Sequence, residues 1–112
     1  MTVTEKTFAC ALPTLLLCRK AGAVTAGVGA TLDAVRRNGG KPAAVILASD
    51  ASERTKKQIR DKCAFYGVDL FEIPASSDEL GRFFGSSSLC AAAAIEKRGP
   101  HPALVEKLRD GR

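Results

Sequence analysis

The chain has 112 residues, of which 46% are hydrophobic and 26% charged, a composition typical of globular proteins that excludes disordered and fibrous classes. Seventeen Lys and Arg residues against twelve Asp and Glu residues give a net charge of +5, which raises the odds of a nucleic-acid partner without defining a site. We expect one domain over residues 1–112, with residues 1–6 disordered.

No apolar run approaches the roughly 18 residues of a membrane-spanning helix. The apolar stretch of residues 8–17 contains Pro13 and leads into Arg19 and Lys20, not into a small-residue cleavage site. These features predict a cytoplasmic protein with no membrane partner.

The cysteines Cys10, Cys18, Cys63 and Cys90 have no CxxC spacing, and the one histidine, His101, lies near the C-terminus. We therefore expect reduced, mostly buried thiols, with no disulfide, no metal and no cofactor.

Apolar periodicity and breaker residues predict the elements in chain order. Apolar residues follow helical spacing from Thr7 to Ala21; the main helix is expected to begin at Leu12 and Pro13, and Gly22 ends it. Ser52 is expected to cap the third helix. The remaining predicted helices cover residues 30–37, 53–66, 78–84 and 100–109, and the predicted strands cover residues 23–26, 43–48, 68–73 and 89–95.

Strands and helices alternate with short connections, a pattern typical of crossovers on a sheet covered by helices on both faces. The strand AAVILA of residues 43–48 is apolar throughout, as in a strand buried on both sides. The predicted fold is α/β, a three-layer α/β/α sandwich with a mixed four-stranded sheet.

Catalysis has little support in the sequence. The body of the chain has no histidine, no Gly-x-Ser-x-Gly and no P-loop, and the cysteines lack a candidate base. Asp50 and Ser52 are interpreted as turn and helix-capping residues. We expect a protein without enzymatic activity.

The turn Gly27-Val28-Gly29 precedes a predicted helix, and the backbone N–H groups at a helix N-terminus bind anions. It is a weak dinucleotide motif, because Leu32 occupies the place of the third glycine. Nucleic-acid phosphate is the better ligand, with charge expected around the same end from Lys20, Arg36, Arg37 and Lys41. A tight turn that needs glycine for its geometry explains the same residues, and this alternative stays open.

Several blocks resemble the ribosomal protein L-seven-Ae/L-thirty-e superfamily. They are the sequence LCRKAG of residues 17–22, Gly27, the sequence AVILASDAS of residues 44–52, Cys63 with the sequence YGV of residues 66–68, and the sequence DELG of residues 78–81. The match runs from about Leu15 to Leu108. The resemblance implies a three-layer α/β/α sandwich and binding of kink-turns, which are sharply bent RNA internal loops.

Within this family, polar residues at the start of the second helix read guanine edges, and a lysine one turn further contacts the RNA. An apolar loop before the last strand packs on a flipped-out nucleotide. The base-reading positions fall at Val28, Gly29 and Ala30, and the lysine position at Asp33. The loop falls at Gly85 to Leu89, which contains Ser86, Ser87 and Ser88.

The chain departs from the family pattern at these positions. Val28, Gly29 and Ala30 offer only backbone groups and so lack bidentate guanine contacts, each of which contributes about 1–3 kcal/mol. Asp33 puts an anion beside phosphates, where two like charges about 4 Å apart in water cost roughly 1 kcal/mol.

Two functions remain open. The first is a non-catalytic module that binds structured RNA or the ribosome as a monomer. The second is a protein-interaction or structural module of the same fold that has lost kink-turn recognition. The net charge favours the first, and the missing reading side chains favour the second.

Overall fold

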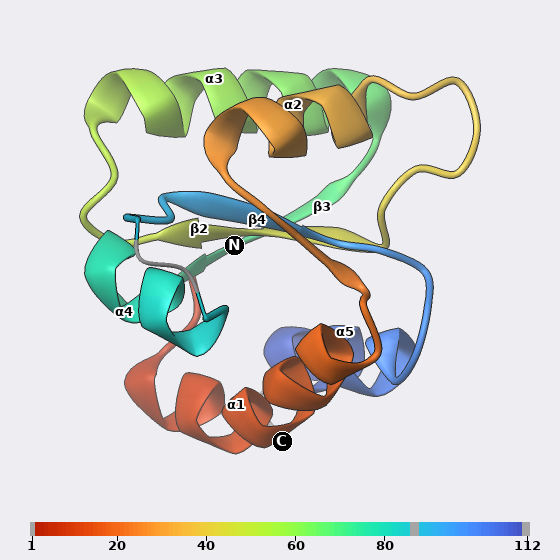
Figure 1. The fold of residues 1–112 in the computed structure, drawn as a ribbon. Helices are drawn as coiled ribbons and strands as arrows, with labels where there is room; N and C mark the ends of the chain where they lie inside the picture. The colour runs from red at the N-terminus through yellow and green to blue at the C-terminus, as the bar shows by residue number, and fades with distance from the viewer. Residues whose placement is uncertain (1, 86–87, 111–112) are drawn as a thin grey trace.

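The computed structural model describes residues 2–85 and 88–110. The described chain folds into three layers, with α2 and α3 on one face of the sheet and α1, α4 and α5 on the other (Figure 1). The predicted α/β/α sandwich is confirmed. Its helices are α1 (Glu5–Lys20), α2 (Val28–Val35), α3 (Glu53–Tyr66), α4 (Ser77–Phe83) and α5 (His101–Asp110), and its strands are β1 (Val24–Ala26), β2 (Ala44–Ala48), β3 (Asp69–Ile73) and β4 (Ala92–Ile95).

The mixed sheet has the strand order β1-β4-β2-β3. Strands β2 and β3 are parallel and are joined through α3, whereas β4 runs antiparallel to both β1 and β2. Val24 and Ala44 both pair with Ile95, and Ala44 also pairs with Asp69. We call this end of the sheet, where β1, β2 and β3 begin, the amino edge, and the end where they finish the carboxyl edge.

The core lies on both faces of the sheet, because side chains of a strand alternate between its faces. Ile46 packs with Phe71 on the face covered by α1, α4 and α5. Val45 and Leu47 pack with Ile59 on the face covered by α2 and α3. All five residues of β2 are buried, which explains the uninterrupted apolar sequence of this strand.

The beginning of α1 differs from the prediction. The helix begins at Glu5, not at Leu12, and the Thr7 N–H donates to the Thr4 hydroxyl as an N-terminal cap. Val3 is buried, and its N–H donates to the Glu72 carbonyl at 2.7 Å.

Pro13 lies inside α1 without ending it. A proline cannot donate to the carbonyl four residues earlier, and here that carbonyl belongs to the exposed Ala9, where water can bind it. Burial of Phe8, Ala11 and Leu15 against the sheet extends the helix across the proline.

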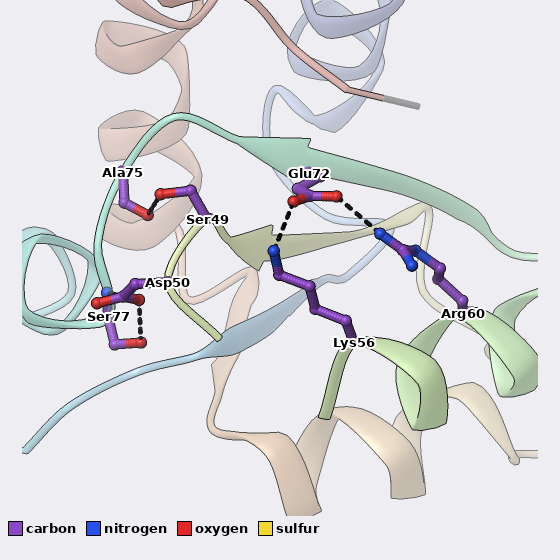
Figure 2. Close-up of polar contacts among 7 residues, drawn as sticks. All are labelled: Ser49, Asp50, Lys56, Arg60, Glu72, Ala75 and Ser77. Atoms are coloured by element: carbon purple, nitrogen blue, oxygen red, sulfur yellow. Dashed lines mark hydrogen bonds and ion pairs between the residues drawn. The ribbon is translucent and has the colours of Figure 1, made fainter. Parts of the chain in front are cut away.

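The capping prediction at Ser52 is confirmed: its hydroxyl accepts a hydrogen bond from the Thr55 N–H at 3.2 Å. Asp50 joins two turns at the carboxyl edge, since its Oδ1 accepts from the Ser77 N–H at 2.8 Å and from the Ser77 hydroxyl at 2.7 Å (Figure 2). These hydrogen bonds lower the pKa of Asp50. Asp50 therefore has a structural role there.

Glu72 on β3 is held by α3. Its carboxylate lies 3.0 Å from Lys56 Nζ and 3.1 Å from an Arg60 guanidinium nitrogen (Figure 2). The hydrogen bond from Lys56, together with that from Arg60, lowers the pKa of Glu72.

In the described part of the chain, no helix has the length and apolar character needed to cross a bilayer.

Candidate functional site

The N-terminus of α2 presents backbone donors at the carboxyl edge. Gly27 caps the helix without a side chain, its N–H donates to the Ala92 carbonyl at 2.9 Å, and its carbonyl accepts from the Thr31 N–H. The N–H groups of Val28, Gly29 and Ala30 precede the first intrahelical donor and have no acceptor within the helix. Gly29 and Ala30 are exposed and Val28 is half-buried, so this positive end of the helix dipole faces outward.

The two glycines of this turn have different roles. Gly27 has φ 106°, a backbone conformation that other residues rarely adopt. Gly29 has ordinary helical geometry, and a Cβ there would meet no atom within 4 Å. The turn therefore requires glycine at position 27 only, and position 29 is open to other side chains.

A second segment, residues 88–91, lies beside this helix end. The sequence predicts that the last strand begins at Leu89, but β4 begins only at Ala92. The Cys90 N–H donates to the Ser77 carbonyl at 2.9 Å, and a Cβ on Gly81 would lie 2.3 Å from the Ser88 carbonyl oxygen. Held close to α4 in this way, the segment leaves Leu89 72% exposed.

The structure brings together the two segments that the resemblance singled out. The Gly27 N–H donates to the carbonyl of Ala92, which follows Leu89 by three positions in the sequence. This hydrogen bond fixes the start of α2 next to the start of β4. Gly85 and Ser88 are exposed, and Ser86 and Ser87 lie outside the described residues. We call Gly27–Ala30 with Ser88–Leu89 the candidate site.

The predicted basic residues do not surround this site, and that expectation is wrong. Arg36 caps the opposite end of α2, about 12 Å along the helix. Lys20 ends α1 just before the start of β1, so it too lies at the amino edge. Lys20 and Arg36 are close to Gly27 in the sequence but not in space, because β1 runs from the amino edge to the carboxyl edge and α2 returns the chain to the amino edge.

Two of these cations already hold parts of the amino edge together. Lys41 Nζ donates to the carbonyls of Val35 and Arg37, at 2.9 and 2.6 Å, and so closes the C-terminus of α2. Arg37 lies 2.9 Å from the buried carboxylate of Glu96.

Asp33 is on the exposed face of α2, one and a half turns from its N-terminus. Its carboxylate lies 2.6 Å from Arg36, with the two side chains 75% and 47% exposed. An exposed pair of this kind offsets only part of the negative charge.

Sequence reasoning missed the cations at the carboxyl edge. Arg54 and Lys57 are exposed on the first turns of α3, which begins at this edge. The sequence signal for Arg54 and Lys57 was the Ser52 cap, which puts the start of α3 directly after β2. Only the strand order shows that this helix start and that of α2 share an edge.

Two surface hollows of about 340 and 460 Å³ lie away from the candidate site, one beside β3 near Cys63 and the other near His101 on α5. Within residues 2–85 and 88–110, no group of His, Cys, Asp and Glu is arranged to hold a metal ion.

Residues 11–105 match the sequence pattern of the ribosomal protein L7Ae/L30e/S12e/Gadd45 family. The chain belongs to this family. The match spans the candidate site, and the family predicted from the sequence blocks is confirmed.

Among curated relatives of this family member, RNA-binding protein YlxQ of Enterococcus faecium is 36% identical over 69 residues. The alignment covers 62% of this chain and 64% of that relative, a little under two thirds of its length. Among solved structures, the Giardia lamblia 15.5kD RNA binding protein superposes with a TM-score of 0.74 at 26% identity, over 97% of this chain and 87% of the other. A protein of unknown function from Bacillus halodurans has the same TM-score at 28% identity, over 88% and 96%.

Proposed function

We propose that this chain is a non-catalytic RNA-binding module of the cytoplasm that acts as a monomer. It binds structured, kink-turn-like RNA, free or within the ribosome, at the candidate site. The observation that carries the proposal is the N-terminus of α2, which no side chain caps and whose three outward N–H donors lie at the same edge of the sheet as the exposed Leu89. Family membership and the RNA-binding names of two relatives support it.

The proposed mechanism is recognition of shape and phosphate. Backbone N–H groups at Val28 to Ala30 donate to phosphate or sugar oxygens at the bend, where the helix dipole favours negative charge. Leu89 packs on an unstacked base, and Arg54 and Lys57 attract the flanking backbone. Because no side chain at positions 28–30 reads a base edge, selectivity comes from the bend more than from sequence.

The alternative is a protein-interaction module. It is favoured by the apolar character of the same surface, where Val28 and Leu89 take the place of polar reading groups. An interface of this kind responds little to salt, whereas phosphate-dominated binding weakens steeply as counterions compete.

The test is the affinity of the protein for a kink-turn RNA and for a straight duplex of equal length, at low and near-physiological salt. The decisive variant is Gly29→Asp. The position has room for a side chain, and a carboxylate in the first turn stabilises a helix while repelling phosphate. We expect about tenfold weaker kink-turn binding with no loss of stability against urea.

Gly39→Asp is the matched control, because Gly39 is exposed, has equal room for a Cβ and lies between α2 and β2 at the amino edge. Its kink-turn affinity should stay close to that of the parent. Equal affinities of the parent for both RNAs, or equal losses in the two variants, contradict the proposed site and favour the protein-interaction module.

A further inference from the structure

Three chain connections meet at the amino edge, far from the candidate site in the fold. They are residues 20–23, from the last residue of α1 to the start of β1, residues 36–43 between α2 and β2, and residues 96–100 between β4 and α5. The Glu96 N–H donates to the Ala23 carbonyl and the Ala43 N–H to the Ile95 carbonyl, each at 2.7 Å. The ion pair of Arg37 with Glu96 joins the second connection to the third.

Positively charged side chains are concentrated in these three connections. We call the cations of the three connections the basic end: Lys20, Arg36, Arg37, Lys41, Lys97 and Arg98. All are exposed except Lys41, which is half-buried. The acidic residue within the same connections is Glu96, which is buried and held by Arg37 and by the Thr25 hydroxyl at 2.6 Å.

The carboxyl edge has no such excess. Its segments 49–57 and 74–82 carry as many acidic as basic side chains. The net charge of +5 is therefore concentrated at the amino edge, opposite to the start of α2. A polyanion is attracted to the amino edge by these cations, and to the carboxyl edge by the helix dipole at the start of α2.

An exposed aromatic group adjoins the basic end. Lys41 Nζ lies 4.4 Å from the centre of the Tyr66 ring, which ties the connection between α2 and β2 to the end of α3. The Phe65 ring packs edge-on against Tyr66, with centroids 4.9 Å apart, yet Phe65 is 81% exposed. The T-shaped contact orients the Phe65 ring while leaving most of its surface in water.

We propose that the basic end and Phe65 form a second RNA-binding surface, which takes an unpaired single strand. Phosphates of the strand lie against the cations, and a base stacks on Phe65. A duplex keeps its bases stacked inside and has no use for an exposed ring, so the aromatic group favours a single strand. This surface goes beyond the kink-turn proposal and does not depend on it.

The test measures binding of the full chain to a short oligouridine RNA, which has no bend and no stem, over a range of salt concentrations. Phe65→Ser should weaken binding about tenfold, within the range for loss of one stacked base. The double variant Lys97→Gln with Arg98→Gln should reduce the slope of log affinity against log salt by about 1.4, at about 0.7 for each phosphate that the protein no longer neutralises.

Matched controls separate the surface from general charge and general apolar exposure. Leu17→Ser removes another exposed apolar side chain, from α1, and the pair Arg54→Gln with Lys57→Gln removes two exposed cations from the carboxyl edge. Both should leave oligouridine binding unchanged, as should Gly29→Asp. All the substituted side chains are exposed, so the fold should persist, as checked by circular dichroism.

The proposal is overturned if oligouridine does not bind at low salt, if Phe65→Ser has no effect, or if the two double variants weaken binding equally. Binding of an acidic protein at this surface in place of RNA also overturns it. Failure here is distinguishable from failure of the kink-turn proposal, since Gly29→Asp tests only the start of α2 and Phe65→Ser only the basic end.

Discussion

Replacing Asp33 by lysine should strengthen binding of kink-turn RNA. Asp33 lies on the exposed face of α2, at the position where the family resemblance places a lysine that contacts RNA. One unit charge about 4 Å from a phosphate in water contributes roughly 1 kcal/mol. Changing the charge from −1 to +1 both removes a repulsion and adds an attraction, so the gain is about 2 kcal/mol, or roughly thirtyfold in Kd.

The cost to folding should be small. The variant loses the exposed ion pair of Asp33 with Arg36, and pairs of this kind at helical spacing contribute about 0.3–0.5 kcal/mol. A lysine at position 33 also repels Arg36 by a similar amount, so urea unfolding should detect a change of no more than about 1 kcal/mol.

The assay compares Asp33→Lys with Glu106→Lys, which makes the same charge change at an exposed position of α5 in the opposite layer. Affinities for the kink-turn and for a straight duplex are measured at low and near-physiological salt. The reasoning is refuted if both variants gain equally on both RNAs, because the effect is then one of net charge and not of the candidate site.

Three further predictions concern the fold around the site. Gly81→Ala should destabilise the fold by about 1–3 kcal/mol and weaken kink-turn binding, because the new Cβ meets the backbone of residue 88. In most helices the same substitution stabilises by about 0.5–1 kcal/mol. A variant as stable as the parent contradicts the close approach. The pKa of Glu72 is lowered from its ordinary value of 4.5, chiefly by the hydrogen bond from Lys56. Its ion pairs therefore stabilise the fold above pH 4.5, and this contribution is lost as the pH falls. In Glu72→Gln, the free energy of unfolding in urea should change less with pH over that acidic range. Burial raises the pKa of Cys63 to about 11, whereas Cys10 is exposed, so mass spectrometry after mild alkylation should find Cys10 modified first, and early labelling of Cys63 argues against its burial.

Local patterns carried most of the prediction of the fold. The Ser52 cap, the end of α3 before Gly67 and the uninterrupted apolar strand around Ile46 depend on neighbours within a few residues, and the structure has all three. The start of α1 was missed for the opposite reason. Proline at position 13 is a local signal for a helix start, and burial of Phe8 and Leu15 against the sheet outweighs it.

The candidate site was half predictable. The glycine turn before α2 identified a helix N-terminus, and the resemblance pointed to the segment around Leu89. Lys20, Arg36 and Lys41 were assigned to the same end because they are close to Gly27 in sequence. The structure has them at the far edge.

The sequence by itself determined the family, the order of helices and strands, and the Ser52 cap of α3, because periodicity and capping act over one or two turns of chain. Only the tertiary structure decided which helix ends and strand ends lie next to one another. Pairing of β4 between β1 and β2 brings Leu89 to the start of α2 and gathers the basic connections at the opposite edge. Such pairing joins strands up to about seventy residues apart, as between Val24 and Ile95, and no short-range pattern encodes it.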